Sequence, residues 1–269
     1  MTASVLPGRA VALKRSRLRA SIGDSIVVTE RNLIGYLRIP EQLFFSSVQP
    51  IMFVLLFRYV FGGAISPPGM SYVDYLIPGI LVQTVLFGSV STSVGLAEDL
   101  QKGLVDRFRS LPMARSAVLA GRTSADSIRN VFVILLVIGV GYLVGFRVGT
   151  NFAGFLAAFA LLLFFAYAVS WGFSCIGLSA PNSETAQLMA FPILFPLTFA
   201  SSAFVPTETM PSWLRWFADH QPVGVVVNAT RALLEGGPTA RWVIPAVIWS
   251  LALLFVFAPL AVWRYRKTA

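Results

Sequence analysis

The sequence predicts an all-α integral membrane protein with six transmembrane helices. Hydrophobic residues make up 56% of the 269 residues, charged residues make up 12%, and the mean hydropathy is +0.74. A soluble domain has about 25% charged residues, so this chain lacks the polar surface that a water-exposed exterior needs. Several apolar runs also reach the roughly 20 residues that a helix needs to cross a bilayer.

We divide the chain into a cytoplasmic N-terminal segment, residues 1–41, and a transmembrane domain, residues 42–269. The expected spans cover approximately residues 43–61, 75–97, 128–146, 152–176, 185–205 and 242–263. The first ends at the helix-breaking pair Gly62-Gly63. The fifth contains Pro192 and Pro196, each of which removes a backbone donor, so we expect this helix to kink or break.

Basic residues are concentrated in the segments that this arrangement places on one side of the membrane. Seven lysines and arginines precede the first span, six lie between the second and third spans, three follow the sixth, and four lie in the opposite loops. Short basic loops stay in the cytoplasm, so we expect both termini and the loop 98–127 to be cytoplasmic. The net charge of +9 is then a topology signal. It favours anionic lipid headgroups, not nucleic acid, as neighbours.

Two segments on the expected cytoplasmic side have the pattern of amphipathic helices. The first runs from Glu98 to Pro112, and its apolar stripe is Leu100, Leu104, Phe108 and Leu111. The charged residues Glu98, Asp99, Lys102, Asp106, Arg107 and Arg109 fall mainly off this stripe. Two interpretations remain open, a helix lying among headgroups or a docking element for a cytosolic partner. The second, residues 22–38, has Ile22, Ile26, Leu33 and Leu37 on one side, which predicts a helix along the inner membrane surface.

The longest outward connection, residues 206–241, has an interfacial character. Trp213 and Trp216 flank Arg215, and tryptophan favours the headgroup level. The apolar run that follows Pro222 is too short to span the bilayer. We predict two short re-entrant helices in the outer leaflet, with an ordinary surface loop as the alternative. His220, the single histidine, is expected to be a structural hydrogen-bonding residue.

The second span has small residues near one face, including Gly88, Ser91 and Thr92. Small residues allow close helix packing, and the alternative is that they line a translocation path together with Pro192 and Pro196. The chain has no phosphate-binding loop and no zinc-helix motif. It also has no acidic residue near the middle of an expected span, so an ion-coupled carrier would lack an ionisable relay. We therefore expect no catalytic, cofactor or metal site, although a self-contained transporter, a channel or a lipid-modifying enzyme remain alternatives.

Taken together, these segments resemble the membrane subunit of type-2 ABC exporters, in particular the daunorubicin-resistance type of permease from actinobacteria. The resemblance rests mainly on "EDLQKGLVDRFRSLPMARSAVLAGRTSAD" (98–126) and "SSAFVPTETMPSWLRWFADHQPVGVVVNATRALLEGG" (201–237). It implies that Glu98 to Pro112 is a coupling helix seated in a cleft of a separate ATPase subunit, which uses ATP and Mg. It further implies two ATPase copies, a second permease copy or paralogue, and export of an amphipathic drug or lipid-like substrate across a bacterial plasma membrane.

Overall fold

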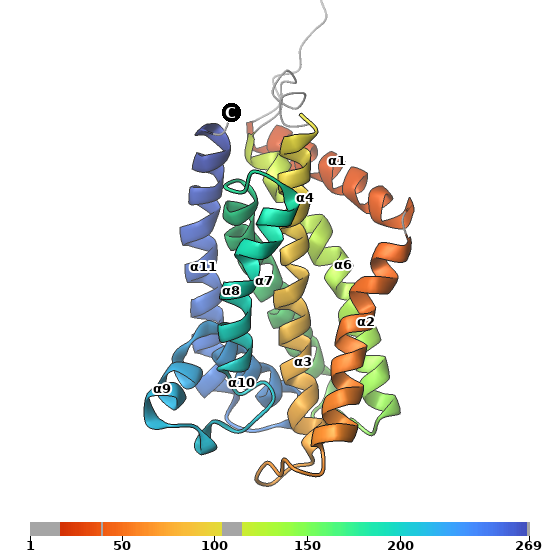
Figure 1. The fold of residues 1–269 in the computed structure, drawn as a ribbon, viewed down its shortest axis with the longest axis vertical. Coiled ribbons are helices and arrows are strands. Elements are labelled where there is room, and N and C mark those ends of the chain that lie inside the picture. Colours follow the sequence, from red (N-terminus) through yellow and green to blue (C-terminus); the bar gives the residue numbers. More distant parts are fainter. Residues whose placement is uncertain (1–16, 39, 104–114, 268–269) are drawn as a thin grey trace, which may run out of the picture.

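The computed structural model describes residues 17–38, 40–103 and 115–267, and every regular element in these ranges is a helix (Figure 1). The α-helices are α1 Arg17–Arg38, α2 Pro40–Leu56, α3 Tyr72–Gly88, α4 Val90–Gln101, α6 Arg115–Leu143, α7 Phe152–Gly177, α8 Ser183–Phe199, α9 Ser212–His220, α10 Pro222–Glu235 and α11 Thr239–Lys267. A π-helical turn, η1 Phe57–Phe61, extends α2, and a 3₁₀ turn, η2 Thr207–Thr209, precedes α9.

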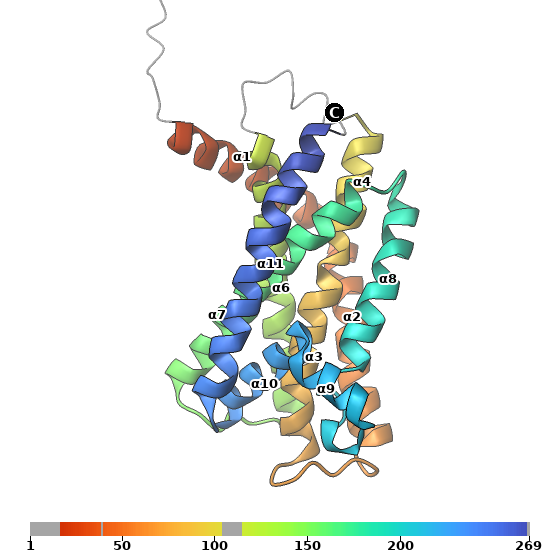
Figure 2. The ribbon, with the colours of Figure 1, turned by 90° about the vertical axis from the view of Figure 1, so that its left-hand side faces the viewer.

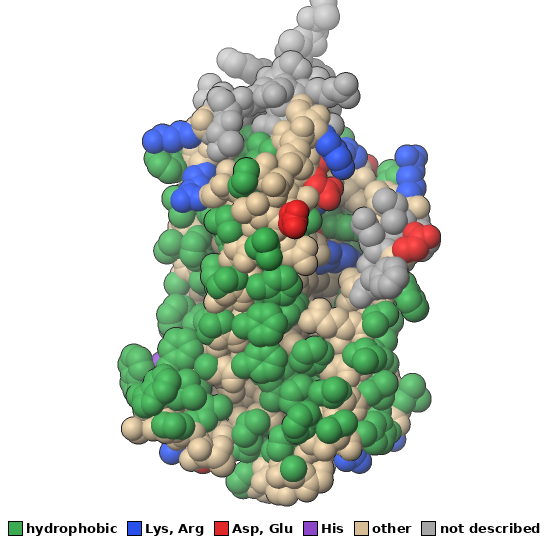
Figure 3. All heavy atoms as spheres, viewed as in Figure 1, with side chains coloured by type: hydrophobic (Ala, Val, Ile, Leu, Met, Phe, Trp, Pro, Cys, Tyr) green, Lys and Arg blue, Asp and Glu red, His purple; other side chains and the backbone are tan. Residues whose placement is uncertain are grey.

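The long helices run along one common axis, and the short helices lie at its two ends (Figures 1 and 2). Helix α1 lies at the end that also holds the C-terminus and the last turn of α4, whereas α9 and α10 lie at the opposite end. Hydrophobic side chains cover most of the face seen in Figure 3, and charged side chains gather at the α1 end. This distribution is typical of a bundle whose middle lies in hydrocarbon.

Four described stretches are long and apolar enough to cross a membrane, which makes the chain a multi-pass membrane protein. They are Tyr72–Gln101, Ser116–Leu143, Phe152–Gly177 and Thr239–Lys267. The first of them contains a step at Ser89, where α3 ends and α4 begins. Two shorter helical segments, α2 with η1 and the 17-residue α8, correspond to the other two expected spans.

Helix α8 continues through both Pro192 and Pro196, so no break occurs in it. Neighbouring helices can satisfy the carbonyl groups that a proline leaves without a donor, which is why such helices tolerate proline in membranes. Helix α6 begins at Arg115, thirteen residues before the expected third span, so several charged residues that we placed in a loop lie on this helix.

Helix α1 packs against α6 through a face that the sequence pattern did not select. Ile26, expected on the apolar face, is 53% exposed, whereas Val28 is 3% exposed and packs against Gly121. The Thr29 hydroxyl donates to the Gly121 carbonyl at 3.1 Å. The face of α1 that packs against α6 is therefore determined by the close approach that Gly121 allows. The exposed Ile26, Val27 and Ile34 are available to contact a membrane surface.

Helix α10 is held inside the protein. Nearly all of its residues from Val223 to Leu234 are buried, and it packs against α3, α7 and α11. The side chain of Gln221 caps its first turn by accepting from the Val223 N–H, and it donates to the Leu197 carbonyl at the end of α8. The apolar residues of α10 therefore contact neighbouring helices, and α9 carries the exposed aromatic side chains.

Candidate functional site

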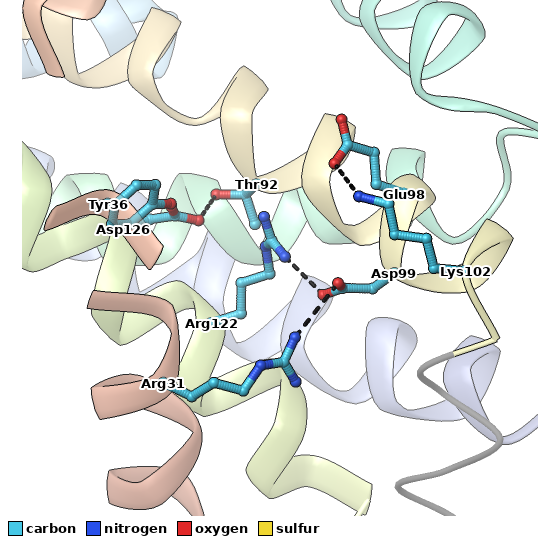
Figure 4. A network of polar contacts seen from close by, with 8 residues as sticks. All are labelled: Arg31, Tyr36, Thr92, Glu98, Asp99, Lys102, Arg122 and Asp126. Carbon is cyan, nitrogen blue, oxygen red and sulfur yellow. Dashed lines mark hydrogen bonds and ion pairs between the residues drawn. The ribbon is translucent and has the colours of Figure 1, made fainter. Parts of the chain in front are cut away.

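A buried polar network joins α1, α4 and α6 at the end of the bundle where the C-terminus lies (Figure 4). Its centre is Asp126 on α6, which is fully buried. One carboxylate oxygen of Asp126 accepts a short hydrogen bond from the Tyr36 hydroxyl on α1. The other oxygen accepts from the Thr92 hydroxyl on α4 at 2.5 Å. A single carboxylate thereby fixes three helices relative to one another.

Ion pairs extend the network toward the last turn of α4. The Arg122 guanidinium on α6 donates to Asp99 at 2.7 Å, and the side chains of Arg122 and Asp99 are only 14% and 18% exposed. Arg31 on α1 reaches the other oxygen of Asp99 at 3.7 Å. The neighbouring pair of Glu98 and Lys102, at 3.3 Å, is much more exposed. Asp99 is thus the point where the end of α4 is tied to both α1 and α6.

The protonation of the network follows from its burial. Burial raises the pKa of the Tyr36 hydroxyl, and the adjacent Asp126 carboxylate raises this pKa further. The tyrosine therefore stays protonated and acts as the donor to Asp126 across the physiological range. The guanidinium of Arg129 lies over the Tyr36 ring, 5.5 Å from its centroid, which adds a cation–π contact between α6 and α1.

An open cavity of about 530 Å³ lies beside the network, between α1, α2, α4, α6 and α8. Figure 3 shows a hollow in this region with basic side chains at its floor. Its lining combines apolar residues with polar and charged ones: Tyr36, Glu41, Ser46, Gln49, Phe87, Val90, Ser91, Val94, Gly95, Glu98, Arg122, Arg129, Gln187 and Phe191. Such a mixed surface suits an amphipathic molecule better than a purely apolar one.

A smaller hollow of about 130 Å³ shares five of these residues and continues along α3 and α6. Gln83 lines it, and in the described part of the protein neither polar atom of its buried amide has a hydrogen-bond partner. The amide nitrogen of Asn130, also in the lining, has none within those same ranges. Buried polar groups of this kind need a partner, so the hollow presents hydrogen-bonding groups to whatever occupies it.

Only some of the residues that we predicted for a substrate path line the two cavities. Gly88 and Ser91 line the cavities, whereas Thr92 is buried and bonds to Asp126. Pro192 and Pro196 are not among the lining residues, and α8 contributes Gln187 and Phe191 instead. A Cβ atom on Gly88 would lie 2.6 Å from the Asn130 side-chain oxygen, and the Gly88 carbonyl accepts from Arg129 at 2.6 Å. Gly88 is therefore also a close packing point between α3 and α6.

Only part of the predicted coupling helix belongs to the described chain. Glu98 and Asp99 take part in the ion pairs above, and Leu100 packs against the buried cluster that contains Leu96 and Leu119. Leu100 thus faces the bundle. Helix α4 ends at Gln101 and Gly103 has a φ of +64°, so the expected single helix from Glu98 to Pro112 is interrupted at this turn. Leu104, Asp106, Arg107, Phe108, Arg109 and Leu111 lie outside the described residues.

At the opposite end, α9 exposes Trp213 and Trp216, which are 71% and 66% accessible. His220 bonds through Nδ1 to the Trp216 carbonyl at 2.8 Å and stacks on the Trp216 ring, which is the local structural role we expected. Pro222 occupies the first turn of α10, where its missing N–H costs nothing. In the described ranges, no group of three histidines, cysteines or carboxylates could hold a metal ion.

Sequence reasoning missed two buried charge sites. Arg122, Asp126 and Arg129 recur at spacings of four and three, a helical signal that we could have used to extend α6 backward. Arg231 on α10 lies over the Tyr75 ring at 3.6 Å and donates to the carbonyl groups of Tyr75 and Ser202. No pattern in the sequence around Arg231 indicates that this side chain links α10 to α3.

Comparison with known proteins agrees with this arrangement. The family model described as ABC-2 type transporter matches residues 25–234. The chain is 35% identical over 238 residues to the daunorubicin resistance ABC transporter permease protein DrrB1 of Streptomyces coeruleorubidus, an alignment that covers 88% of this chain and 84% of the relative. It is 25% identical over 266 residues to the probable doxorubicin resistance ABC transporter permease protein DrrC of Mycobacterium tuberculosis, with 98% and 94% covered. It is 26% identical over 259 residues to the doxorubicin resistance permease DrrB of the same species, with 89% and 88% covered.

Proposed function

The chain belongs to the ABC-2 type transporter family, and from this premise we propose that it exports an amphipathic drug or lipid-like molecule across a bacterial plasma membrane. It is a permease subunit of an ABC transporter and not an enzyme by itself, and a partner ATPase uses the ATP. The relatives named for daunorubicin and doxorubicin resistance support a substrate of that amphipathic class. The mixed lining of the 530 Å³ cavity supports it as well.

The proposal rests on an ion pair that joins the two helices on either side of residues 102–115. Asp99, just before this segment, and Arg122, just after it, form a 2.7 Å ion pair that is largely buried. A force applied to the segment by a moving ATPase would reach both α4 and α6, because the pair links these helices. We propose that Glu98 to Pro112 is the coupling element, with Leu104, Phe108 and Leu111 seated in a cleft of the ATPase, whereas Leu100 packs inside the bundle.

We propose six spans, with α2–η1 and α8 crossing the membrane beside the four longer stretches, and with α9 and α10 as a re-entrant outer element. Both termini then lie in the cytoplasm, together with the network around Asp126. The two prolines of α8 and the 17-residue length of this helix are compatible with a span that is supported by neighbouring helices.

We propose that the complete transporter has two permease subunits, either two copies or a pair of paralogues, and two ATPase subunits. The cavity supports the second permease subunit. It opens beside α2 and α8 and contains the polar groups of Gln49, Ser91 and Arg129. Hydrocarbon chains cannot satisfy such groups, so a protein surface is expected to face them.

The test is a pull-down of the ATPase with the Phe108→Asp permease, alongside an export assay. A buried charge in place of an apolar anchor costs several kcal/mol, so we expect the ATPase to dissociate or to hydrolyse ATP without transport. Phe152→Asp is the matched control, because Phe152 is 77% exposed at the other end of the bundle. Normal ATPase binding and normal export with Phe108→Asp would refute the docking role.

A further inference from the structure

We propose that a groove between α8 and α11, with α7 as its floor, binds one anionic phospholipid, with an acyl chain in the groove and the phosphate on Arg264. The groove lies away from the network and from the mixed cavity. A lipid bound in this groove is a ligand of the protein and is distinct from the exported substrate.

The groove has a volume of about 500 Å³ and an almost wholly apolar lining. Its walls are mainly aliphatic and aromatic side chains of α7, α8 and α11, among them Phe173, Ile193, Leu197, Leu253, Phe257 and Leu260. Leu86 of α3 and Val223 of α10 also contribute to the lining. Met189 and Ile193 also lie on its rim and are 42% and 46% exposed, so this side of α8 is open to an apolar surrounding. An apolar trough of this kind suits a hydrocarbon chain.

The length of the groove is close to the thickness of one leaflet of the bilayer. Along α11 the lining runs from Leu253 to Arg264, about 16 Å at the helical rise per residue, and along α7 and the turn that follows it the lining runs from Phe165 to Ser179, about 21 Å. Half of a hydrocarbon core is about 15 Å thick. The groove thus accommodates a chain that starts at the level of the headgroups on the Arg264 side and ends near the middle of the membrane.

Among the described residues, Arg264 is the only charged one in the lining, and it lies at the end of the groove where α11 reaches its last turn. Its guanidinium donates to the Ser179 hydroxyl oxygen and to the Cys175 carbonyl at 3.3 Å, which directs it across the mouth between α7 and α11. Within residues 17–38, 40–103 and 115–267, no carboxylate lines the groove. Guanidinium groups match phosphate well, so the charge at the mouth favours an anionic headgroup.

The experiment uses the complete transporter, permease with its ATPase, in phosphatidylcholine vesicles. These vesicles carry a trace of phosphatidylglycerol with a photoreactive acyl chain or, in a second arm, phosphatidylcholine with the same chain. We expect phosphatidylglycerol to label residues of α7, α8 and α11 that line the groove, and phosphatidylcholine to label them less. Arg264→Gln is expected to lower the phosphatidylglycerol labelling about tenfold, because it removes a charge-assisted contact. Arg266→Gln is the matched control, with the same charge change at an exposed position outside the groove.

A second variant tests the acyl chain separately from the headgroup. A Cβ atom on Gly172 would lie 3.6 Å from the Phe257 ring, an ordinary contact distance. Gly172→Ala should therefore keep the labelling, whereas Gly172→Phe should fill the groove and reduce labelling by both lipids.

The headgroup site would be overturned if the two lipids labelled the wild-type protein equally. It would also be overturned if Arg264→Gln left the phosphatidylglycerol labelling unchanged. Displacement of the lipid by daunorubicin would identify the groove as a drug site and would likewise overturn the proposal. Transport is not a readout here, so failure of this inference is distinguishable from failure of the proposed export function.

Discussion

The ion pair between Arg122 and Asp99 should be one of the strongest polar contacts at the end of the bundle where the C-terminus lies. The perturbation is a double-mutant cycle with Arg122→Gln, Asp99→Asn and the double variant. Removing one partner of a fully buried pair costs about 3–5 kcal/mol, whereas exposed pairs contribute about 0.2–1 kcal/mol. The Arg122 and Asp99 side chains are 14% and 18% exposed, with 2.7 Å between nitrogen and oxygen. We therefore expect a coupling energy of about 2–3 kcal/mol.

The assay is unfolding of the purified permease by sodium dodecyl sulfate in mixed micelles, which reports the free energy of unfolding of each variant. The control is the pair of Glu98 and Lys102 on the same helix end, at 3.3 Å but with side chains 45% and 65% exposed. Its cycle should give at most about 0.5 kcal/mol. The comparison isolates the effect of burial, because both pairs lie at the end of α4.

A third perturbation breaks the buried pair without changing any charge. A Cβ atom on Gly95 would lie 1.6 Å from an Arg122 guanidinium nitrogen, so Gly95→Ala must push the guanidinium away. This variant should lose stability as Arg122→Gln does. Our reasoning would be refuted if the Arg122–Asp99 cycle gave no more coupling energy than the exposed pair.

Three further predictions concern other parts of the protein. Tyr36→Phe removes the hydroxyl that donates to the fully buried Asp126, and we expect the free energy of unfolding to fall by about 1–3 kcal/mol in the same titration. Burial raises the pKa of Glu235 from its usual 4.5 to about 7, so the folded state binds this proton more tightly than the unfolded state does. The stability from this protonation is full below about pH 4.5 and is lost as the pH rises through about 7, so Glu235→Gln should raise the melting temperature at high pH but not at low pH. In intact cells, a membrane-impermeant maleimide should label Thr209→Cys and should not label Lys102→Cys.

Each of these has a result that would contradict it. Wild-type stability of Tyr36→Phe would mean that the Asp126 carboxylate is satisfied without the tyrosine. A shift in melting temperature that is equal at both pH extremes would remove the role of the Glu235 proton. The labelling needs a Cys175→Ser background, since Cys175 is the only cysteine, and labelling of Lys102→Cys from outside would reverse the proposed topology.

The membrane class and the long helices could be read from the sequence because they depend on properties that each segment carries alone. A run of apolar residues of bilayer length is recognisable without its neighbours, and the expected span 152–176 coincides almost completely with α7, Phe152–Gly177. The family also follows from local patterns spread over most of the chain, and the match over residues 25–234 agrees with it.

The buried network could not be found in this way, because its members come from distant positions. Asp126 meets Tyr36 and Thr92, which are 90 and 34 residues away in the sequence. A carboxylate on a predicted loop is ordinarily exposed, and only the packing of α1 and α4 around α6 makes burial of this one tolerable.

The same limit explains the inward face of α1. Hydrophobic periodicity placed Ile26 on the face toward the membrane surface, but it did not identify the residues that face the protein. A glycine on another helix, Gly121, determines that Val28 is the residue that packs. The amino-acid pattern by itself identified the four long helices that are apolar enough to cross a membrane, since transfer into hydrocarbon is a property of each segment. Only the tertiary structure decided which charges are buried and paired, since that depends on the partners that other segments bring to them.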